Sequence, residues 1–179
     1  MGQEGYPPGT WTNAIAAQIK ALSSSLVIDG SDGFYNTATK RTAPGLASSL
    51  VDIMSDHTYP RTLTVINKEI PLAQKANKNF LLGEWDWTNS GGTSLSSFTS
   101  KIEAQHYMGS MIWNVMGHDA ACCNYVTHSD GFSLYYPTEA GGSNSLQANK
   151  LAVVKHWYKL TGRAQPKTLP GVACPQPVF

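Results

Sequence analysis

The feature that most constrains the fold is a regular alternation of short apolar runs with longer segments of helical periodicity. Apolar runs occur at Ser25–Ile28, Val51–Met54, Phe80–Gly83 and Ser110–Asn114. Each run is too short for a helix and predicts a buried strand. Helical stripes separate the runs, so the expected order is one helix followed by four strand-helix units. This order predicts an α/β protein with a parallel sheet and no strand face exposed to water.

The first helical stripe is the clearest. Trp11, Ile15, Ile19 and Leu22 recur at helical spacing, which predicts an amphipathic helix. Thr10 precedes the stripe and is the expected N-cap.

The later helical segments are defined by apolar spacing and by breakers. They are expected at Leu46–Leu50, Ile66–Ala73, Leu95–Ile102 and Leu146–Leu160. Pro71 should kink or split the second of these. Gly162 should end the last, so we predict one domain over residues 1–162 and a proline-rich tail over residues 163–179.

Charge and hydropathy exclude several classes of partner. The formal net charge of the 179 residues is +1. The sequence has no run of Lys or Arg that could follow phosphates or anionic lipid, so nucleic acid and membrane surfaces are not expected as partners. The N-terminal residues lack the pattern of a signal peptide. No segment approaches the about 20 apolar residues that cross a bilayer.

Cysteines and candidate metal ligands give weaker signals. Cys122, Cys123 and Cys174 form an odd set without the Cys-x-x-Cys spacing of zinc sites, and their pairing stays open. His118-Asp119 and His128-x-Asp130 do not make up a matched ligand set. We therefore expect no metal.

Polar and aromatic residues follow the predicted strands where each one ends. They are Asp29, His57, Tyr59, Glu84 and Trp113. No glycine-rich phosphate loop follows any strand, which disfavours nucleotide-binding α/β folds. In a (β/α)₈ barrel the carboxyl ends of the strands form the active site, and a carboxylate beside aromatic rings suits glycosidic bond cleavage.

Three motifs in this order make the sequence similar to a known family. Leu82-Gly83-Glu84-Trp85, His57-Thr58-Tyr59 one unit earlier and Trp113 one unit later resemble the last strands of glycoside hydrolase family 5, especially its fungal β-mannanase-like members. The likeness runs from about Pro8 to Gly162. It implies an α/β fold that is the C-terminal half of a (β/α)₈ TIM barrel, with about four βα units and a preceding helix.

The resemblance also implies roles for individual residues. Glu84 would be the catalytic nucleophile of a retaining hydrolase, with Tyr59 and His57 hydrogen-bonded beside it. Trp113 would form the floor under the sugar. Trp85 and Trp87 would either extend the sugar-binding surface or pack under a loop. No cofactor is implied, and the partner would be a polysaccharide or oligosaccharide.

The second catalytic carboxylate of the family has no counterpart in this sequence. The family takes its acid/base from an Asn-Glu pair, and no such dipeptide occurs here. Glu4 is the nearest candidate, but no apolar strand precedes it. We therefore expect a secreted β-1,4-glycanase, mannan endo-1,4-β-mannosidase-like, of which this chain is the C-terminal half. The missing N-terminal half-barrel, or a second copy of this chain, would pair with it. The alternatives are a non-catalytic sugar-binding remnant, or a mis-started gene model or decayed copy that has no independent stable fold. Mannan, cellulose, glucan and xylan are not distinguished.

Overall fold

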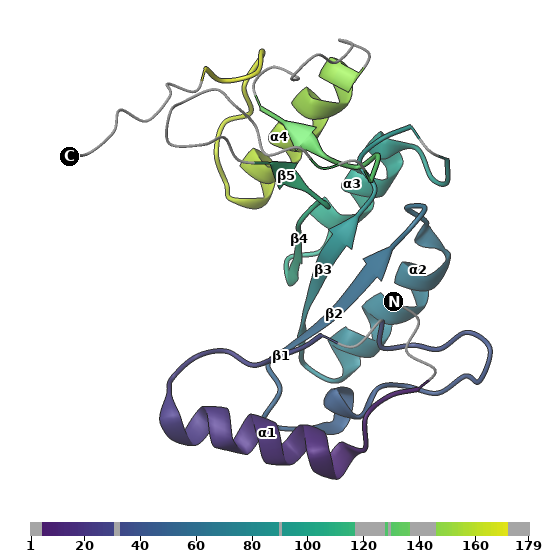
Figure 1. The fold of residues 1–179 in the computed structure, drawn as a ribbon, viewed down its shortest axis with the longest axis vertical. Coiled ribbons are helices and arrows are strands. Elements are labelled where there is room, and N and C mark those ends of the chain that lie inside the picture. The colour runs from purple at the N-terminus through teal and green to yellow at the C-terminus, as the bar shows by residue number, and fades with distance from the viewer. Residues whose placement is uncertain are drawn as a thin grey trace.

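The computed structural model describes residues 5–30, 33–89, 91–116, 128, 130–136 and 146–171. Its centre is a parallel sheet in the order β1-β2-β3-β4, formed by Ile28–Asp29, Ile53–Thr58, Asn79–Trp85 and Met108–Ser110. Figure 1 shows β2 and β3 as the long strands at its middle. The prediction of an α/β protein with a parallel sheet is confirmed.

Four α-helices accompany the sheet among the described residues: α1 (Gly9–Leu22), α2 (Leu63–Lys75), α3 (Leu95–Glu103) and α4 (Gln147–Leu160). Thr62 and Ser94 cap α2 and α3, since each side chain accepts a hydrogen bond from the first helical turn. Gly162 lies just beyond α4 with φ of +69°, a conformation that favours glycine at a helix end. The expected end of the last helix is confirmed.

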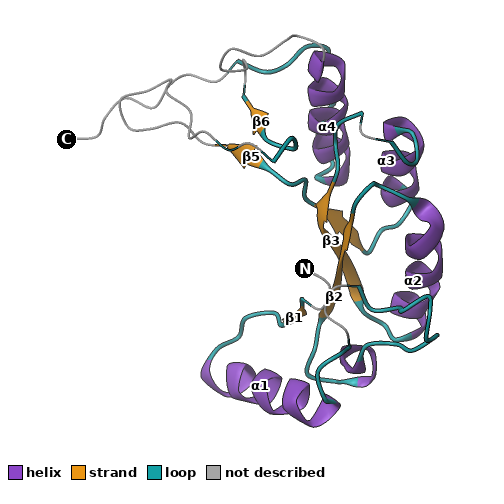
Figure 2. Ribbon diagram, turned by 45° about the vertical axis from the view of Figure 1, so that its right-hand side comes forward, coloured by secondary structure: helices purple, strands orange, loops and turns teal. Residues whose placement is uncertain are grey.

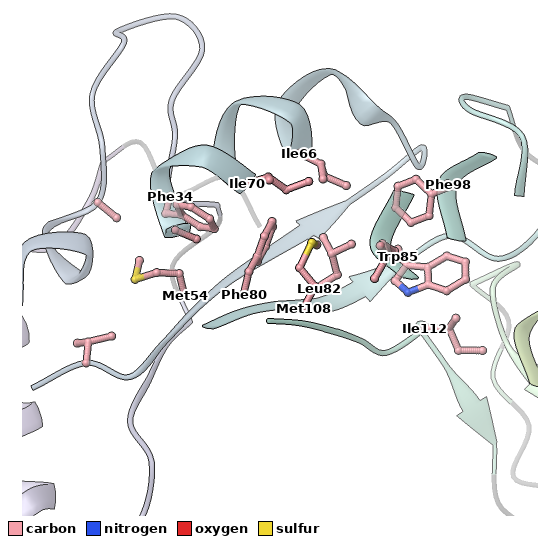
Figure 3. Close-up of a cluster of buried hydrophobic side chains, with 14 of the residues drawn as sticks. Phe34, Met54, Ile66, Ile70, Phe80, Leu82, Trp85, Phe98, Met108 and Ile112 are labelled. Carbon is pink, nitrogen blue, oxygen red and sulfur yellow. The ribbon is translucent and has the colours of Figure 1, made fainter. Parts of the chain in front are cut away.

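Helices α2, α3 and α4 lie on one side of the sheet, and α1 lies apart at its lower end (Figure 2). The core between these helices and the sheet is drawn in Figure 3. It contains Ile66 and Ile70 of α2, Phe80 and Leu82 of β3, and Phe98 of α3, all buried. Burial of such side chains stabilises the fold by about 2 kcal/mol each.

Helix α1 forms where expected but faces the other way. Trp11 is 56% exposed and Ile15 is 45% exposed, whereas Thr12 and Ala16 are buried. The helix begins at Gly9, after Pro8, with no side-chain cap, so the assignment of Thr10 as N-cap is wrong. The apolar face of α1 is therefore left largely uncovered by the described residues.

The predicted strand positions are shifted. β2 continues through the polar residues up to Thr58, and β4 ends at Ser110, the first residue of the strand expected at Ser110–Asn114. The expectation that no strand face meets water is also wrong, because Ile28 and His57 are exposed. The strand face opposite the helices carries these exposed side chains because no described helix packs there (Figure 2).

Three smaller elements complete the described part of the fold. A 3₁₀ helix, η1 (Pro44–Ala47), replaces the short helix expected at Leu46–Leu50. Strands β5 (Val115–Met116) and β6 (Leu134–Tyr135), which were not expected, pair in parallel.

Helix α2 continues through Pro71, so it is not split. Pro71 is exposed on the helix, and its missing N–H removes only one hydrogen bond, to the carbonyl of Asn67. Among the residues described, no helix is long and apolar enough to span a membrane.

Candidate functional site

Glu84 lies near the carboxyl end of β3, beside the end of β2. The strand register pairs it with His57, after a shift between Asp56 and His57. Neighbouring residues in register point to the same face of a sheet. The irregularity therefore brings the His57 ring and the Glu84 carboxylate together on the face without helices.

Two side chains from the end of β2 contact the Glu84 carboxylate. The Tyr59 hydroxyl donates a hydrogen bond to Glu84 Oε2 at 3.2 Å. His57 Nδ1 lies 3.5 Å from the same oxygen. The structure thus brings together the predicted nucleophile and both predicted neighbours.

Burial, followed by the negative charge of Glu84, raises the pKa of Tyr59. The phenol therefore stays protonated at neutral pH and remains a donor to Glu84. Tyr59 is linked to Pro60 by a cis peptide bond.

Gly83 allows the close approach of the two strands at this point. A Cβ at Gly83 would lie 2.8 Å from His57 Nε2 and 2.9 Å from Ser55 Oγ. Any side chain here would push the imidazole away from Glu84. This steric requirement explains the glycine directly before the candidate nucleophile.

Trp113 follows β4 and is 37% exposed, so it can offer a ring face to a ligand. Its indole Nε1 donates a 2.5 Å hydrogen bond to Asp130 Oδ2. Its backbone N–H donates to the carbonyl of Trp85 at 3.4 Å, which ties the residue to the end of β3.

Phe132 connects the remaining aromatic groups. Its ring packs against Tyr59 with centroids 5.2 Å apart. Its carbonyl accepts hydrogen bonds from Trp87 Nε1 at 2.6 Å and from the N–H of Asn114 at 3.1 Å. The sequence alone assigns no role to Phe132 or Asp130. The signal it offers is His128-x-Asp130, which as a sequence motif suggests only an incomplete metal site.

Trp85 and Trp87 do not reach the site surface. Trp85 is fully buried against Phe98 and His156, and Trp87 is 1% exposed. A sugar platform needs an exposed ring face, which neither side chain has in this structure. Both side chains are packed in the interior, Trp85 against α3 and α4, so neither extends the sugar-binding surface in this structure.

The remaining polar residues of the sequence analysis lie elsewhere. Asp29 ends β1 but is buried against Gly45, where a Cβ would come within 2.2 Å of its carboxylate. In the described part of the chain no three His, Cys, Asp or Glu residues could hold a metal ion together. The three cysteines and His118-Asp119 lie outside the described residues.

A second group of residues has the arrangement of a hydrolytic triad. Ser110 Oγ lies 2.6 Å from His156 Nε2, and His156 Nδ1 lies 2.8 Å from Glu103 Oε1. A hydroxyl, an imidazole and a carboxylate in this order match the nucleophile, base and orienting group of acyl transfer. However, Ser110 is 7% exposed and His156 is 1% exposed. A substrate cannot reach them, so the group joins α3, β4 and α4 instead.

The charges in this buried group are consistent with a structural role. Burial lowers the pKa of His156, which therefore stays neutral between Ser110 and Glu103. Burial alone would raise the pKa of Glu103, but hydrogen bonds with Lys159 and His156 outweigh it and leave the pKa lowered.

A buried pair of carboxyl groups, Asp56 and Glu69, lies between β2 and α2. Burial, followed by the Asp56 charge, raises the pKa of Glu69 to about 9. Glu69 Oε1 accepts hydrogen bonds from the N–H groups of Phe34 at 2.8 Å and Tyr35 at 3.1 Å. Glu69 therefore carries a proton at neutral pH while it holds the loop that follows β1.

A cavity lies away from Glu84, beside α1. It measures about 540 Å³ and is lined by the apolar face of α1 together with the edge of the sheet at β1. Trp11, Ile15, Ile19, Val27 and Ile28 contribute its apolar walls, and no residue of the Glu84 site lines it.

Comparison with known proteins gives a fold likeness. No protein-family model matches the sequence, and no curated protein matches it. The structure is similar to an endo-β-1,4-mannanase from Thermotoga petrophila, with a TM-score of 0.60 and 15% identity over 89% of this chain and 41% of the mannanase. A hyperthermostable endo-1,4-β-D-mannanase from T. petrophila RKU-1, solved with maltose and glycerol, gives a TM-score of 0.59 and 15% identity over 81% and 51% of the two chains.

Both alignments cover no more than about half of the mannanase chains. The parallel sheet and this structural similarity confirm the expected α/β fold with parallel strands. The chain therefore has an α/β fold that matches part of the TIM barrel of these mannanases.

Proposed function

We propose that this chain is the C-terminal half of a retaining β-1,4-glycan hydrolase, of the fungal β-mannanase-like kind within glycoside hydrolase family 5, with Glu84 as its nucleophile. The observation that carries the proposal is the contact of Tyr59 and His57 with one oxygen of Glu84, at the carboxyl ends of adjacent parallel strands. Barrel enzymes place their catalytic groups at these strand ends. The fold likeness to two endo-mannanases points to the same chemistry and to a polysaccharide substrate.

In the proposed mechanism, Glu84 attacks the anomeric carbon while the glycosidic oxygen leaves, and a glycosyl ester forms on Glu84. The Tyr59 hydroxyl orients the carboxylate through Oε2. The exposed indole of Trp113 packs against the sugar ring. A second carboxylic acid must protonate the leaving oxygen and then activate water to release the sugar.

Among the described residues, the carboxyl groups near the sheet do not suit this second role. Glu69 is protonated at neutral pH but is fully buried between β2 and α2. Asp86 is buried beside Arg61. Asp130 has a pKa that its hydrogen bonds lower, so it is ionised at neutral pH. We infer that the acid/base belongs to a part of the barrel that precedes α1.

The topology favours a complementary half-barrel over a second copy as the missing part. A closed barrel has eight strands, and one helix joins each pair of neighbouring strands. In this chain α1 precedes β1 and α4 follows β4. Two copies would therefore place α1 of one copy and α4 of the other at the same junction. A unit that begins and ends with a strand avoids this conflict and would cover Trp11 and Ile15.

An activated glycoside tests Glu84 without the missing acid. A 2,4-dinitrophenyl 2-deoxy-2-fluoro-β-mannoside has a leaving group that needs no protonation, and its fluorine slows hydrolysis of the glycosyl ester. We expect release of one equivalent of dinitrophenolate and a covalent mass increase on the peptide that contains Glu84. Glu84→Gln should abolish both, whereas Glu69→Gln, a matched change at a buried glutamate, should retain both.

The alternatives predict different results. A sugar-binding remnant would bind β-1,4-mannohexaose equally well in the unmodified chain and in Glu84→Gln, and would never be labelled. A chain without an independent fold would show neither labelling nor binding and would unfold without a cooperative transition. A panel of mannan, cellulose, glucan and xylan oligosaccharides would then define the substrate, and polymer degradation would imply a secreted parent enzyme.

A further inference from the structure

We propose that Asp130 is a positioning residue that fixes the indole plane of Trp113 for stacking on a sugar. The inference rests on the proposed function, because it assigns Trp113 the sugar-binding face. Neither the family resemblance nor the fold likeness assigns a role to Asp130.

The Asp130 carboxylate is itself held rigidly. Oδ2 accepts the Trp113 indole N–H at 2.5 Å, and Oδ1 accepts the N–H of Phe132 at 2.9 Å and the Ser133 hydroxyl at 3.3 Å. His128 Nδ1 lies 3.3 Å from Oδ2. Both carboxylate oxygens of Asp130 accept hydrogen bonds, so the side chain has a fixed orientation. It can therefore hold the indole of Trp113 in a narrower range of positions than a freely rotating side chain could.

His128 restricts the same indole from a second direction. Its ring meets Trp113 edge to face, with centroids 6.2 Å apart and an interplanar angle of 76°. His128 is held in turn by Ser133, whose hydroxyl oxygen lies 3.2 Å from Nδ1 and 3.3 Å from the His128 carbonyl oxygen. Rotation of the Trp113 side chain would break the Asp130 hydrogen bond and this ring contact together.

The charge of Asp130 suits an acceptor and not an acid. Burial alone would raise its pKa, but hydrogen bonds from Phe132 and Trp113 and the nearby His128 outweigh burial and lower the pKa. The carboxylate is thus ionised at neutral pH, and a hydrogen bond to an ionised acceptor is about twice as strong as a neutral one. Asp130 therefore holds Trp113 and does not act as the proton donor of the proposed reaction.

The segment that carries Asp130 also reaches the nucleophile. Phe132 packs on Tyr59, and the Tyr59 hydroxyl donates to Glu84. The Asp130 charge helps to keep Tyr59 protonated by raising its pKa, after burial and Glu84. One short segment thus sets the sugar-facing indole and supports the ring that orients Glu84.

The first measurement concerns the indole directly and needs no sugar. In a ¹H–¹⁵N spectrum, Trp113→Phe identifies the Trp113 Nε1–H resonance by its loss. We expect this resonance far downfield in the unmodified chain and shifted upfield in Asp130→Asn, while the other indole resonances stay in place. Asp52→Asn is the matched control, because Asp52 also accepts two hydrogen bonds, from Lys20 and Val27, at the opposite end of the sheet. An unmoved Trp113 resonance in Asp130→Asn overturns the proposal.

The second measurement links the indole to sugar binding, with β-1,4-mannohexaose as the probe in calorimetry. Loss of a fixed side-chain orientation costs about 0.5–1.5 kcal/mol on binding, so Asp130→Asn should bind about two- to tenfold more weakly. In a chain that already carries Trp113→Phe, Asp130→Asn should not weaken oligosaccharide binding any further. Equal losses in both backgrounds would overturn the positioning role. An unmodified chain that shows the downfield indole but binds no oligosaccharide would instead overturn the proposed function, and with it the assignment of Trp113 to a sugar.

Discussion

The buried carboxyl of Glu69 gives the protein a definite dependence of stability on pH. The pKa of Glu69 is raised from 4.5 to about 9, so the folded chain retains a proton that the unfolded chain releases. The stability that this proton supports is fully present below pH 4.5 and is lost as the pH rises toward 9. Glu69→Gln keeps an oxygen for the N–H groups of Phe34 and Tyr35 but has no proton to lose.

The size of the effect follows from the shift. Each pH unit between the two pKa values changes the free energy of unfolding by about 1.4 kcal/mol, so the range from about pH 5.5 to about pH 8 amounts to about 3 kcal/mol. The charge of Asp56 contributes to this shift after burial. We therefore expect Glu69→Gln to gain stability over the unmodified chain by about 1–3 kcal/mol across that range.

Urea unfolding followed by circular dichroism, repeated at half-unit steps of pH, measures this difference. Asp52→Asn controls for the loss of a carboxylate, because Asp52 has a lowered pKa and directly precedes β2. If the difference between Glu69→Gln and the unmodified chain is constant across the whole range, Glu69 is already ionised in the fold and the reasoning is refuted.

Three further predictions have directional outcomes. Gly83→Ala should lower the free energy of unfolding by about 1–3 kcal/mol in urea titrations, because the added Cβ meets the ring of His57; an unchanged midpoint would contradict this. Because the pKa of His156 is lowered in the fold, the stabilisation that the neutral ring provides is present above pH 6.5 and is lost as the pH falls. The melting temperature of the unmodified chain should therefore fall more steeply below pH 6.5 than that of His156→Gln. Ile15→Glu, at an exposed position of α1, should leave the melting temperature unchanged and reduce binding of an apolar dye. Ala16→Glu, at the buried position beside it, should lower the free energy of unfolding by about 3 kcal/mol or more. Equal effects of the two changes would contradict the orientation of α1.

The order of elements was predictable because it depends on local periodicity. Alternating apolar runs and helical stripes predicted the α/β class, and the helices lie close to their expected positions. Strand limits were less accurate, because β2 continues through Ser55, Asp56 and His57, which no apolar pattern marks. A strand with a polar face at a functional site looks like a loop when only its sequence is examined.

The candidate site was predictable where it depends on strand order alone. The ends of adjacent parallel strands share one edge of the sheet, which is why His57, Tyr59 and Glu84 come together. The orientation of α1 and the burial of Trp85 and Trp87 depend on tertiary packing, which periodicity does not contain. The Asp130 contact depends on the path of an irregular segment, and no spacing rule predicts such a path.

The Ser110, His156 and Glu103 group shows what a catalytic template leaves out. A search for hydrolases that matched only interatomic distances would select these three residues, and it would pass over Glu84, whose partner acid is absent from the described residues. The template is satisfied because the same donor and acceptor order that activates a serine also joins two helices to a strand. Distance templates for enzyme discovery should therefore be paired with the solvent accessibility of the nucleophile, which separates this structural triad from a catalytic one.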